Sequence, residues 1–230
     1  MPYVSRNSNG VCRYFSIKKI SAYMTRQTRG YLMFLKARPR CRDVNFGIIL
    51  SVPFLRDSGR MTIAKIVSGG QTGVDRGALE AALRLGFPYG GMIPNGRKAE
   101  DGVVPLKFTA MTESESEDYR FRTRWNAEHS DATLILSFTP TLEGGTQRTR
   151  QYCMNARKPY FVDNPSSPAT AKGALKVTWW LDKVCKKNGG APIVLNVAGP
   201  RESKCPGIAE ATEKYISRLI EQQGTKEDKT

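Results

Sequence analysis

The sequence predicts an α/β fold: a three-layer sandwich in which helices cover both faces of a mostly parallel sheet of five or more strands. Two observations support this. From residue 61 onward, short apolar or β-branched runs alternate with segments whose apolar residues recur at helical spacing. The run at 133–136 is apolar apart from one threonine, which is typical of a central parallel strand covered on both faces.

The segment 63–76 is the most informative part of the chain. A β-branched run stops at Gly69 and Gly70, a short polar loop with Gly73 follows, and apolar residues then recur at helical spacing. A strand, a glycine turn and a helix in this order form the unit by which Rossmann-like folds present backbone N–H groups to a phosphate. The loop is neither GxGxxG nor the P-loop GxxxxGK(S/T), so it predicts a nucleotide-like ligand without identifying it.

The remaining elements follow from the same patterns. Strands are expected at 64–68, 89–93, 132–138, 159–162 and 193–197, and helices at 74–85, 118–129, 146–156, 169–187 and 208–222. Asp75 is placed near the N-terminus of the first helix, and Gly86 ends that helix. No internal repeat is visible. The Rossmann-like domain is therefore expected to span 61–223, followed by a frayed polar tail at 224–230.

The positive charge is concentrated at the start of the chain. The whole sequence of 230 residues has a formal net charge of +15. Residues 1–60 hold 12 Lys or Arg and 2 Asp or Glu, a net +10, which leaves +5 for the rest. We expect residues 1–60 to be a basic, disordered extension. A natural start at Met61, directly before the first strand, is the expectation we favour, and a nucleic-acid-binding tail is the alternative.

Cysteine and histidine usage argues against a metal held by the protein. The five cysteines are far apart and His129 is the only histidine, whereas a zinc site needs about four ligands with close pairs among them. The wide spacing fits reduced thiols in a cytoplasmic protein. No apolar run approaches the ~20 residues of a membrane-spanning helix, so no membrane association is expected.

Polar or glycine-rich loops follow four of the predicted strands. In parallel sheets the ligand lies beyond the carboxyl ends of the strands, so the four loops are expected at one pole. The candidate ligand-binding residues are Gly69, Gly70, Gln71, Thr72, Gly73, Asp75, Gly96, Arg97, Glu100, Asp101, Arg122, Asn126, Gly144, Gly145, Thr146, Asn196, Gly199, Arg201 and Ser203.

These residues offer one consistent chemistry. Two predicted helix N-termini, near 73–75 and 145–147, supply N–H groups and positive dipole ends, and the loops add hydroxyls and arginines. Carboxylates such as Glu100, Asp101 and Asp75 are suited to accept hydrogen bonds from ribose or pterin-type N–H groups. Together they predict a pocket for a phosphate-bearing heterocycle. Neither a nucleophile with a matched base nor a catalytic metal cluster is visible, so no catalytic residue is assigned.

With these motifs in order, residues 62–222 resemble the molybdenum carrier family of the Rossmann-like SLOG superfamily, which includes the LOG proteins labelled "lysine decarboxylase". The matching segments are 69–76 (GGQTGVDR), 96–102 (GRKAEDG), 122–126 (RTRWN), 130–135 (SDATLI), 144–146 (GGT) and 196–203 (NVAGPRES). The resemblance implies a carrier of a phosphorylated, nucleotide-like ligand, with the molybdenum cofactor, a pterin carrying a phosphate, as the named cargo. It also implies a homo-oligomer.

Two alternatives stay open. A LOG-like hydrolase would cleave a nucleoside 5'-monophosphate at its glycosidic bond, with Glu100 or Asp101 as acid–base group. LOG-type enzymes resemble PGGxGTxxE, and residues 144–149 lack the glutamate of that motif. The second alternative is nucleic-acid association through the basic tail and the Arg-rich helix at 119–126, which predicts an affinity that falls steeply with salt.

Overall fold

The computed structural model describes the backbone of residues 4–6, 12–14, 21–27, 30–36, 62–166 and 171–224, and the side chains of 62–166 and 176–223. The chain divides into two units, Met1–Arg56 and Asp57–Thr230. In the first unit, β1 (Val4–Arg6) pairs with β2 (Cys12–Tyr14), and β3 (Ser21–Gln27) pairs with β4 (Gly30–Lys36), both antiparallel. The predictions of a disordered extension and of a start at Met61 concern residues that lie mostly outside the described ones, and they stay predictions.

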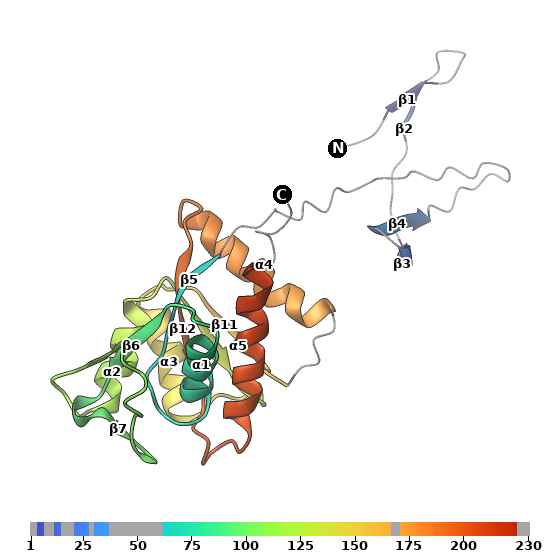
Figure 1. Ribbon diagram of the computed structural model, residues 1–230. Helices are drawn as coiled ribbons and strands as arrows, with labels where there is room; N and C mark the ends of the chain where they lie inside the picture. Colours follow the sequence, from blue (N-terminus) through green and yellow to red (C-terminus); the bar gives the residue numbers. More distant parts are fainter. Residues whose placement is uncertain are drawn as a thin grey trace, which may run out of the picture. The chain divides into compact units, whose positions relative to one another are not determined.

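A six-stranded parallel sheet forms the centre of the second unit (Figure 1). Its strands are β5 (Ile63–Val67), β6 (Tyr89–Ile93), β9 (Met111–Glu113), β10 (Ala132–Leu136), β11 (Tyr160–Asp163) and β12 (Ile193–Ala198). Their order across the sheet is β11-β10-β12-β5-β6-β9, and every neighbouring pair is parallel. The last of the described strands, β12, therefore lies between β5 and β10. Because β12 lies between them, the loops that follow β5, β10 and β12 meet at one edge of the sheet, although these strands are far apart in the sequence.

Helices cover both faces of this sheet, as predicted. They are α1 (Val74–Arg84), α2 (Tyr119–Glu128), α3 (Gly144–Asn155), α4 (Ala171–Lys187) and α5 (Ile208–Gly224). Helices α1, α4 and α5 share one hydrophobic core with β5, β10 and β12, which includes Leu134, Leu181 and Ile216. Helices α2 and α3 contact each other, with α2 also against β6 and α3 against β10. The three-layer prediction is confirmed.

The structure adds elements that periodicity did not predict. A 3₁₀ turn η1 (Asn95–Arg97) and a small antiparallel hairpin, β7 (Lys98–Ala99) and β8 (Gly102–Val103), occupy the segment expected to be a loop. Strand β9 was also missed, because three residues are too short for a periodic signal. A second core cluster beneath this region, including Ile93, Val104 and Phe108, supports the hairpin and β9.

Helix boundaries differ from the prediction by a few residues. Helix α3 begins at Gly144 rather than at residue 146, so the glycines form its first turn. Helix α5 extends to Gly224, and residues 225–230 lie outside the described ones, as do residues 167–170 before α4. Among the described helices, none combines the length and the apolar character needed to cross a bilayer.

Candidate functional site

Three of the four predicted loops extend from neighbouring strands at the carboxyl edge of the sheet. Residues 68–73 follow β5, residues 199–203 follow β12 and residues 137–143 follow β10, with β12 in the middle. Adjacent parallel strands end at the same edge, so their loops lie side by side. The fourth loop contributes through the β7–β8 hairpin, whose turn is formed by Glu100 and Asp101.

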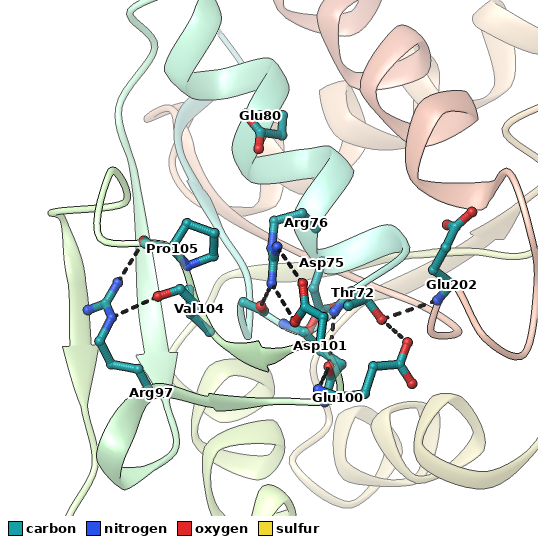
Figure 2. A network of polar contacts seen from close by, with 12 residues as sticks. Thr72, Asp75, Arg76, Glu80, Arg97, Glu100, Asp101, Val104, Pro105 and Glu202 are labelled. Atoms are coloured by element: carbon teal, nitrogen blue, oxygen red, sulfur yellow. Dashed lines mark hydrogen bonds and ion pairs between the residues drawn. The ribbon is translucent and has the colours of Figure 1, made fainter.

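A shallow cavity of about 510 Å³ lies where three of these loops meet. Its lining residues are Thr72, Gly73, Arg76, Glu100, Asp101, Glu202, Ser203 and Ala209. Figure 2 shows Thr72, Glu100, Glu202 and the pair of Arg76 and Asp101 gathered around the start of α1. Five of the eight lining residues belong to the set predicted from the sequence.

Glu100 lies at the centre of the polar contacts in this cavity. Its carboxylate accepts hydrogen bonds from the Thr72 hydroxyl, the Ser203 hydroxyl (2.7 Å) and the Ser203 backbone N–H (3.3 Å). The Arg201 guanidinium lies 3.9 Å from the same carboxylate. Desolvation raises the pKa of Glu100, but the hydrogen bonds from Thr72 and Ser203 and the charge of Arg201 together lower that pKa below its ordinary 4.5. Glu100 is therefore ionised at neutral pH.

Arg76 and Glu202 line the cavity but were not predicted. Arg76 forms a bidentate ion pair with Asp101, with N···O distances of 3.1 and 3.3 Å (Figure 2). Glu202 accepts the backbone N–H groups of Gly207 and Ala209 and so caps the start of α5. Both residues lie directly beside predicted positions in the sequence, and that adjacency was the available signal.

A buried ion pair lies beneath the first loop. The Arg122 guanidinium donates to Asp75 Oδ2 at 3.0 Å, and the exposed fractions of the two side chains are 10% and 6%. The same Asp75 oxygen accepts the Gln71 backbone N–H at 3.3 Å. Burial raises the pKa of Asp75 and outweighs the opposing effect of the Arg122 charge. A Cβ on Gly69 would overlap the Arg122 guanidinium, so this glycine is required by the ion pair.

Glycines hold the loops against one another. Gly73 has a φ of +73°, and a Cβ there would overlap the Pro200 carbonyl and the Glu202 backbone N at 2.7 Å. A Cβ on Gly199 would overlap Val74 and the carbonyl at the end of β10. The Val74 N–H, the first of α1, donates to the Pro200 carbonyl at 3.2 Å. These contacts fix the loop after β5 directly onto the loop after β12.

Several predicted residues face the protein backbone instead of the cavity. Arg97 donates to the carbonyls of Val104 (3.0 Å), Pro105 (3.1 Å) and Phe108 (3.2 Å). Asn126 bonds both the N–H (2.8 Å) and the carbonyl (3.0 Å) of Met92, which extends the hydrogen-bond ladder of β6. Three further predicted residues make contacts within the protein. Asn196 Nδ2 donates to Thr133 Oγ1, the Gly96 N–H donates to the Glu113 carboxylate, and Gln71 Oε1 accepts the N–H groups of Thr72 and Glu100. Gly70, at a φ of +72°, faces Ile93 and Val104.

The loop after β10 presents a different surface. Gly144 and Gly145 are exposed at the start of α3, and a Cβ on either would meet open space. Glu143 makes no side-chain hydrogen bond to this helix end, and the Thr146 N–H donates to the Glu143 carbonyl. The hydrogen bond from the Arg120 backbone N–H is the main cause that lowers the pKa of Asp118, and the charge of Arg148 in α3 acts in the same direction. These residues do not line the cavity.

Arg201 lies between the cavity and the start of α2. Its guanidinium approaches Glu100 on one side and lies 5.1 Å from the centroid of the Tyr119 ring on the other. Tyr119 is the first residue of α2, so Arg201 connects the cavity residue Glu100 with the start of that helix. Among the described residues, no group of three or more His, Cys, Asp or Glu side chains is arranged to hold a metal ion.

Comparisons with known proteins place this geometry in a family. The sequence model of the "Circularly permutated YpsA SLOG family" matches residues 66–220. A crystal structure from Syntrophus aciditrophicus SB, of a protein named "Putative molybdenum carrier protein", matches with a TM-score of 0.62 and 36% sequence identity, covering 69% of this chain and 96% of that one. The search of curated proteins found no match.

Proposed function

This chain belongs to the circularly permuted YpsA SLOG family, and from this premise we propose that it binds and carries a phosphorylated, nucleotide-like small molecule. The molybdenum cofactor is the candidate cargo, because the name of the structural relative describes a molybdenum carrier. The observation that carries the proposal is the meeting of the loops after β5 and β12 with the β7–β8 hairpin around one cavity, beside the loop after β10. In open α/β sheets, this edge is where phosphate-bearing ligands bind.

The start of α3 is the best-supported anchor for a phosphate. The backbone N–H groups of Gly144 and Gly145 lie at an exposed helix end without a side-chain cap, and Arg148 adds a positive charge. Unsatisfied N–H groups and the helix dipole favour an anion at such a position. No Cβ obstructs a ligand at either glycine.

The cavity suits the remainder of such a ligand. Three carboxylates and two hydroxyls line it, and these groups are suited to sugar hydroxyls and to the N–H groups of a heterocycle. The partly exposed Arg201 guanidinium beside Tyr119 offers a cation and an aromatic surface between Glu100 and the start of α2. The dimensions are those of a small-molecule site, since such sites occupy roughly 300–1,000 Å³.

Hydrolysis of a nucleoside monophosphate is the weaker candidate. Glu100, the residue proposed for acid–base work, has a lowered pKa and is engaged by Thr72 and Ser203. An ionised carboxylate cannot donate the proton that a leaving base needs. Incubation of the protein at high concentration with adenosine monophosphate tests this point, and release of free adenine would show that the carrier proposal omits a catalytic activity.

A charge placed at the α3 anchor tests the carrier proposal. We expect Gly145→Asp to weaken binding of the phosphorylated ligand at least about ten-fold, because the new carboxylate repels the phosphate. The same carboxylate should stabilise the fold by roughly 0.3–1 kcal/mol, because it interacts favourably with the helix dipole. Gln151→Glu adds the same charge to an exposed site further along α3 and is the matched control. Mass spectrometry of small molecules released from the purified full chain identifies the ligand, and calorimetry with that molecule measures its affinity. Equal affinities for both variants would argue against this anchor.

The remaining expectations carry over as part of the proposal. We expect a cytoplasmic homo-oligomer without nucleic-acid binding. Light scattering, cell fractionation and a salt titration of nucleic-acid affinity test these three points, and binding that weakens steeply with salt would favour the nucleic-acid alternative.

A further inference from the structure

The Glu100 carboxylate is surrounded by hydrogen-bond donors of the kind that bind oxyanions. Two hydroxyls and one backbone N–H donate to it, and one guanidinium lies nearby. We call these groups of Thr72, Ser203 and Arg201 the oxyanion cradle. Hydroxyls, a backbone N–H and an arginine are the donors that proteins use to hold phosphate and other tetrahedral oxyanions.

The cradle and the carboxylate within it belong to different parts of the fold. Thr72 follows β5, and Arg201 and Ser203 follow β12, so the donors are attached to two neighbouring strands of the central sheet. Glu100 belongs to the two-residue turn of the β7–β8 hairpin. A change of its side-chain rotamer is enough to remove the carboxylate without disturbing the sheet.

Two further donors beside the cradle lack acceptors. Arg76 lines the cavity, and its Nε has no hydrogen-bond partner among the described residues although that atom is buried. The same holds for Nε2 of Gln71, a residue with an exposed fraction of 4% whose Oε1 accepts the N–H groups of both Thr72 and Glu100. Buried donors without acceptors are costly, so a ligand that brought acceptor atoms within reach of either donor would be favoured.

We propose that Glu100 is an internal substitute for the ligand, and that a tetrahedral oxyanion, such as a phosphate monoester, binds in the oxyanion cradle by displacing it. The inference rests on the proposed function and adds a second anion position, formed by the loops after β5 and β12, to the phosphate anchor at the start of α3. In the free protein, the Glu100 carboxylate then fills the cradle. Only molecules with an empty cradle can bind the oxyanion, so the apparent affinity for the oxyanion is reduced by the fraction of molecules in which Glu100 fills the cradle. Glu100 is a competitor of the ligand, in contrast to the hydrogen-bond acceptor that the sequence predicted.

Neutralising Glu100 tests this proposal. The full chain and its Glu100→Gln variant are titrated with sulfate and with adenosine monophosphate, with thermal melts to verify folding. Sulfate keeps its charge across the working pH range, so any change in its binding does not come from titration of the probe. We expect Glu100→Gln to bind both probes about ten-fold more tightly, because the competing charge is gone. Adding Ser203→Ala to this variant should remove most of the gain, because it deletes a cradle donor.

Glu202→Gln is the matched control, since it removes the same charge from the same cavity but leaves the cradle filled. A gain of less than about three-fold in this control supports the proposal. Equal gains in both variants would show simple charge repulsion and overturn it, and so would weaker binding by Glu100→Gln. If the unaltered chain binds the probes and Glu100→Gln binds them no more tightly, the role of Glu100 as a substitute is refuted but the proposed function is not. No binding by any folded variant refutes the proposed function as well.

Discussion

Removal of Arg122 from its buried ion pair is the sharpest test of how the site is held. Arg122→Met keeps much of the side-chain volume but leaves the Asp75 carboxylate without its partner at 3.0 Å, in a place where only 6% of the Asp75 side chain is exposed. Breaking a buried pair from one side costs about 3–5 kcal/mol. We therefore expect a loss of that size in the free energy of unfolding at pH 7, measured by urea denaturation.

The pH dependence of this loss can be worked out from Asp75. Burial already raises the pKa of Asp75, and loss of the Arg122 charge raises that pKa further. The pKa of Asp75 is higher in the folded protein than in the unfolded chain, so the folded state favours the protonated carboxyl. The contribution of Asp75 to stability is therefore fully present below its unfolded-state pKa, and it is lost as the pH rises through its folded-state pKa. Since the buried carboxylate can become protonated instead of staying charged, its cost has an upper limit of about 1.36 kcal/mol per pH unit above the ordinary 3.8. That limit is about 4 kcal/mol at pH 7 and about 2 kcal/mol at pH 5.

Two companion variants make the argument refutable. Arg124→Met breaks the exposed ion pair with Glu128 on the same helix and should cost less than about 1 kcal/mol. Asp75→Asn added to Arg122→Met should recover most of the charge-dependent cost and abolish its pH dependence. An Arg122→Met loss that is the same at pH 5 and pH 7, and that Asp75→Asn does not relieve, would show that an unpaired Asp75 charge is not its cause.

Three further predictions concern single residues. Gly73→Ala should destabilise the fold by roughly 1–3 kcal/mol and weaken ligand binding, because the new Cβ meets the loop after β12 at a strained φ of +73°; equal melting temperatures would contradict this. Asn126→Ala should cost about 1–3 kcal/mol, since both backbone groups of Met92 lose their partner, and faster amide exchange at Met92 would locate the effect. Burial raises the pKa of Tyr215, whose hydroxyl donates to Asp163 at 2.7 Å. In an ultraviolet titration this phenol should therefore stay protonated until the protein unfolds, and ionisation of every tyrosine while the protein is still folded would refute the prediction.

Local sequence patterns were sufficient for the framework of this protein. The β-branched run before Gly69 and the helical spacing after Gly73 follow from chain chemistry, because a strand, a tight glycine turn and an amphipathic helix each leave a local signature. The strand at 89–93 was placed with its observed boundaries. Loops at the carboxyl ends of parallel strands must share an edge, so their proximity followed from the predicted fold class.

Side-chain partners followed no local pattern. Arg97 was assigned to the ligand because arginine suits phosphate, but in the structure its guanidinium donates to three backbone carbonyls. Asn126 likewise bonds the backbone of β6. The sequence alone could not predict these contacts, because a donor binds whichever acceptors the fold brings near it, and the η1 turn, the hairpin and β9 were too short to be foreseen.

The sequence by itself determined the class of fold, the alternation of strands and helices, and the glycine-rich loops that follow the strands. Only the tertiary structure decided that β12 lies between β5 and β10, that Asp75 and Arg122 form a pair, and that Glu100 fills the donors of Thr72 and Ser203. The reason is physical. Periodicity reports which face of an element is buried, whereas strand order and long-range pairing depend on how the whole chain buries its apolar surface at once.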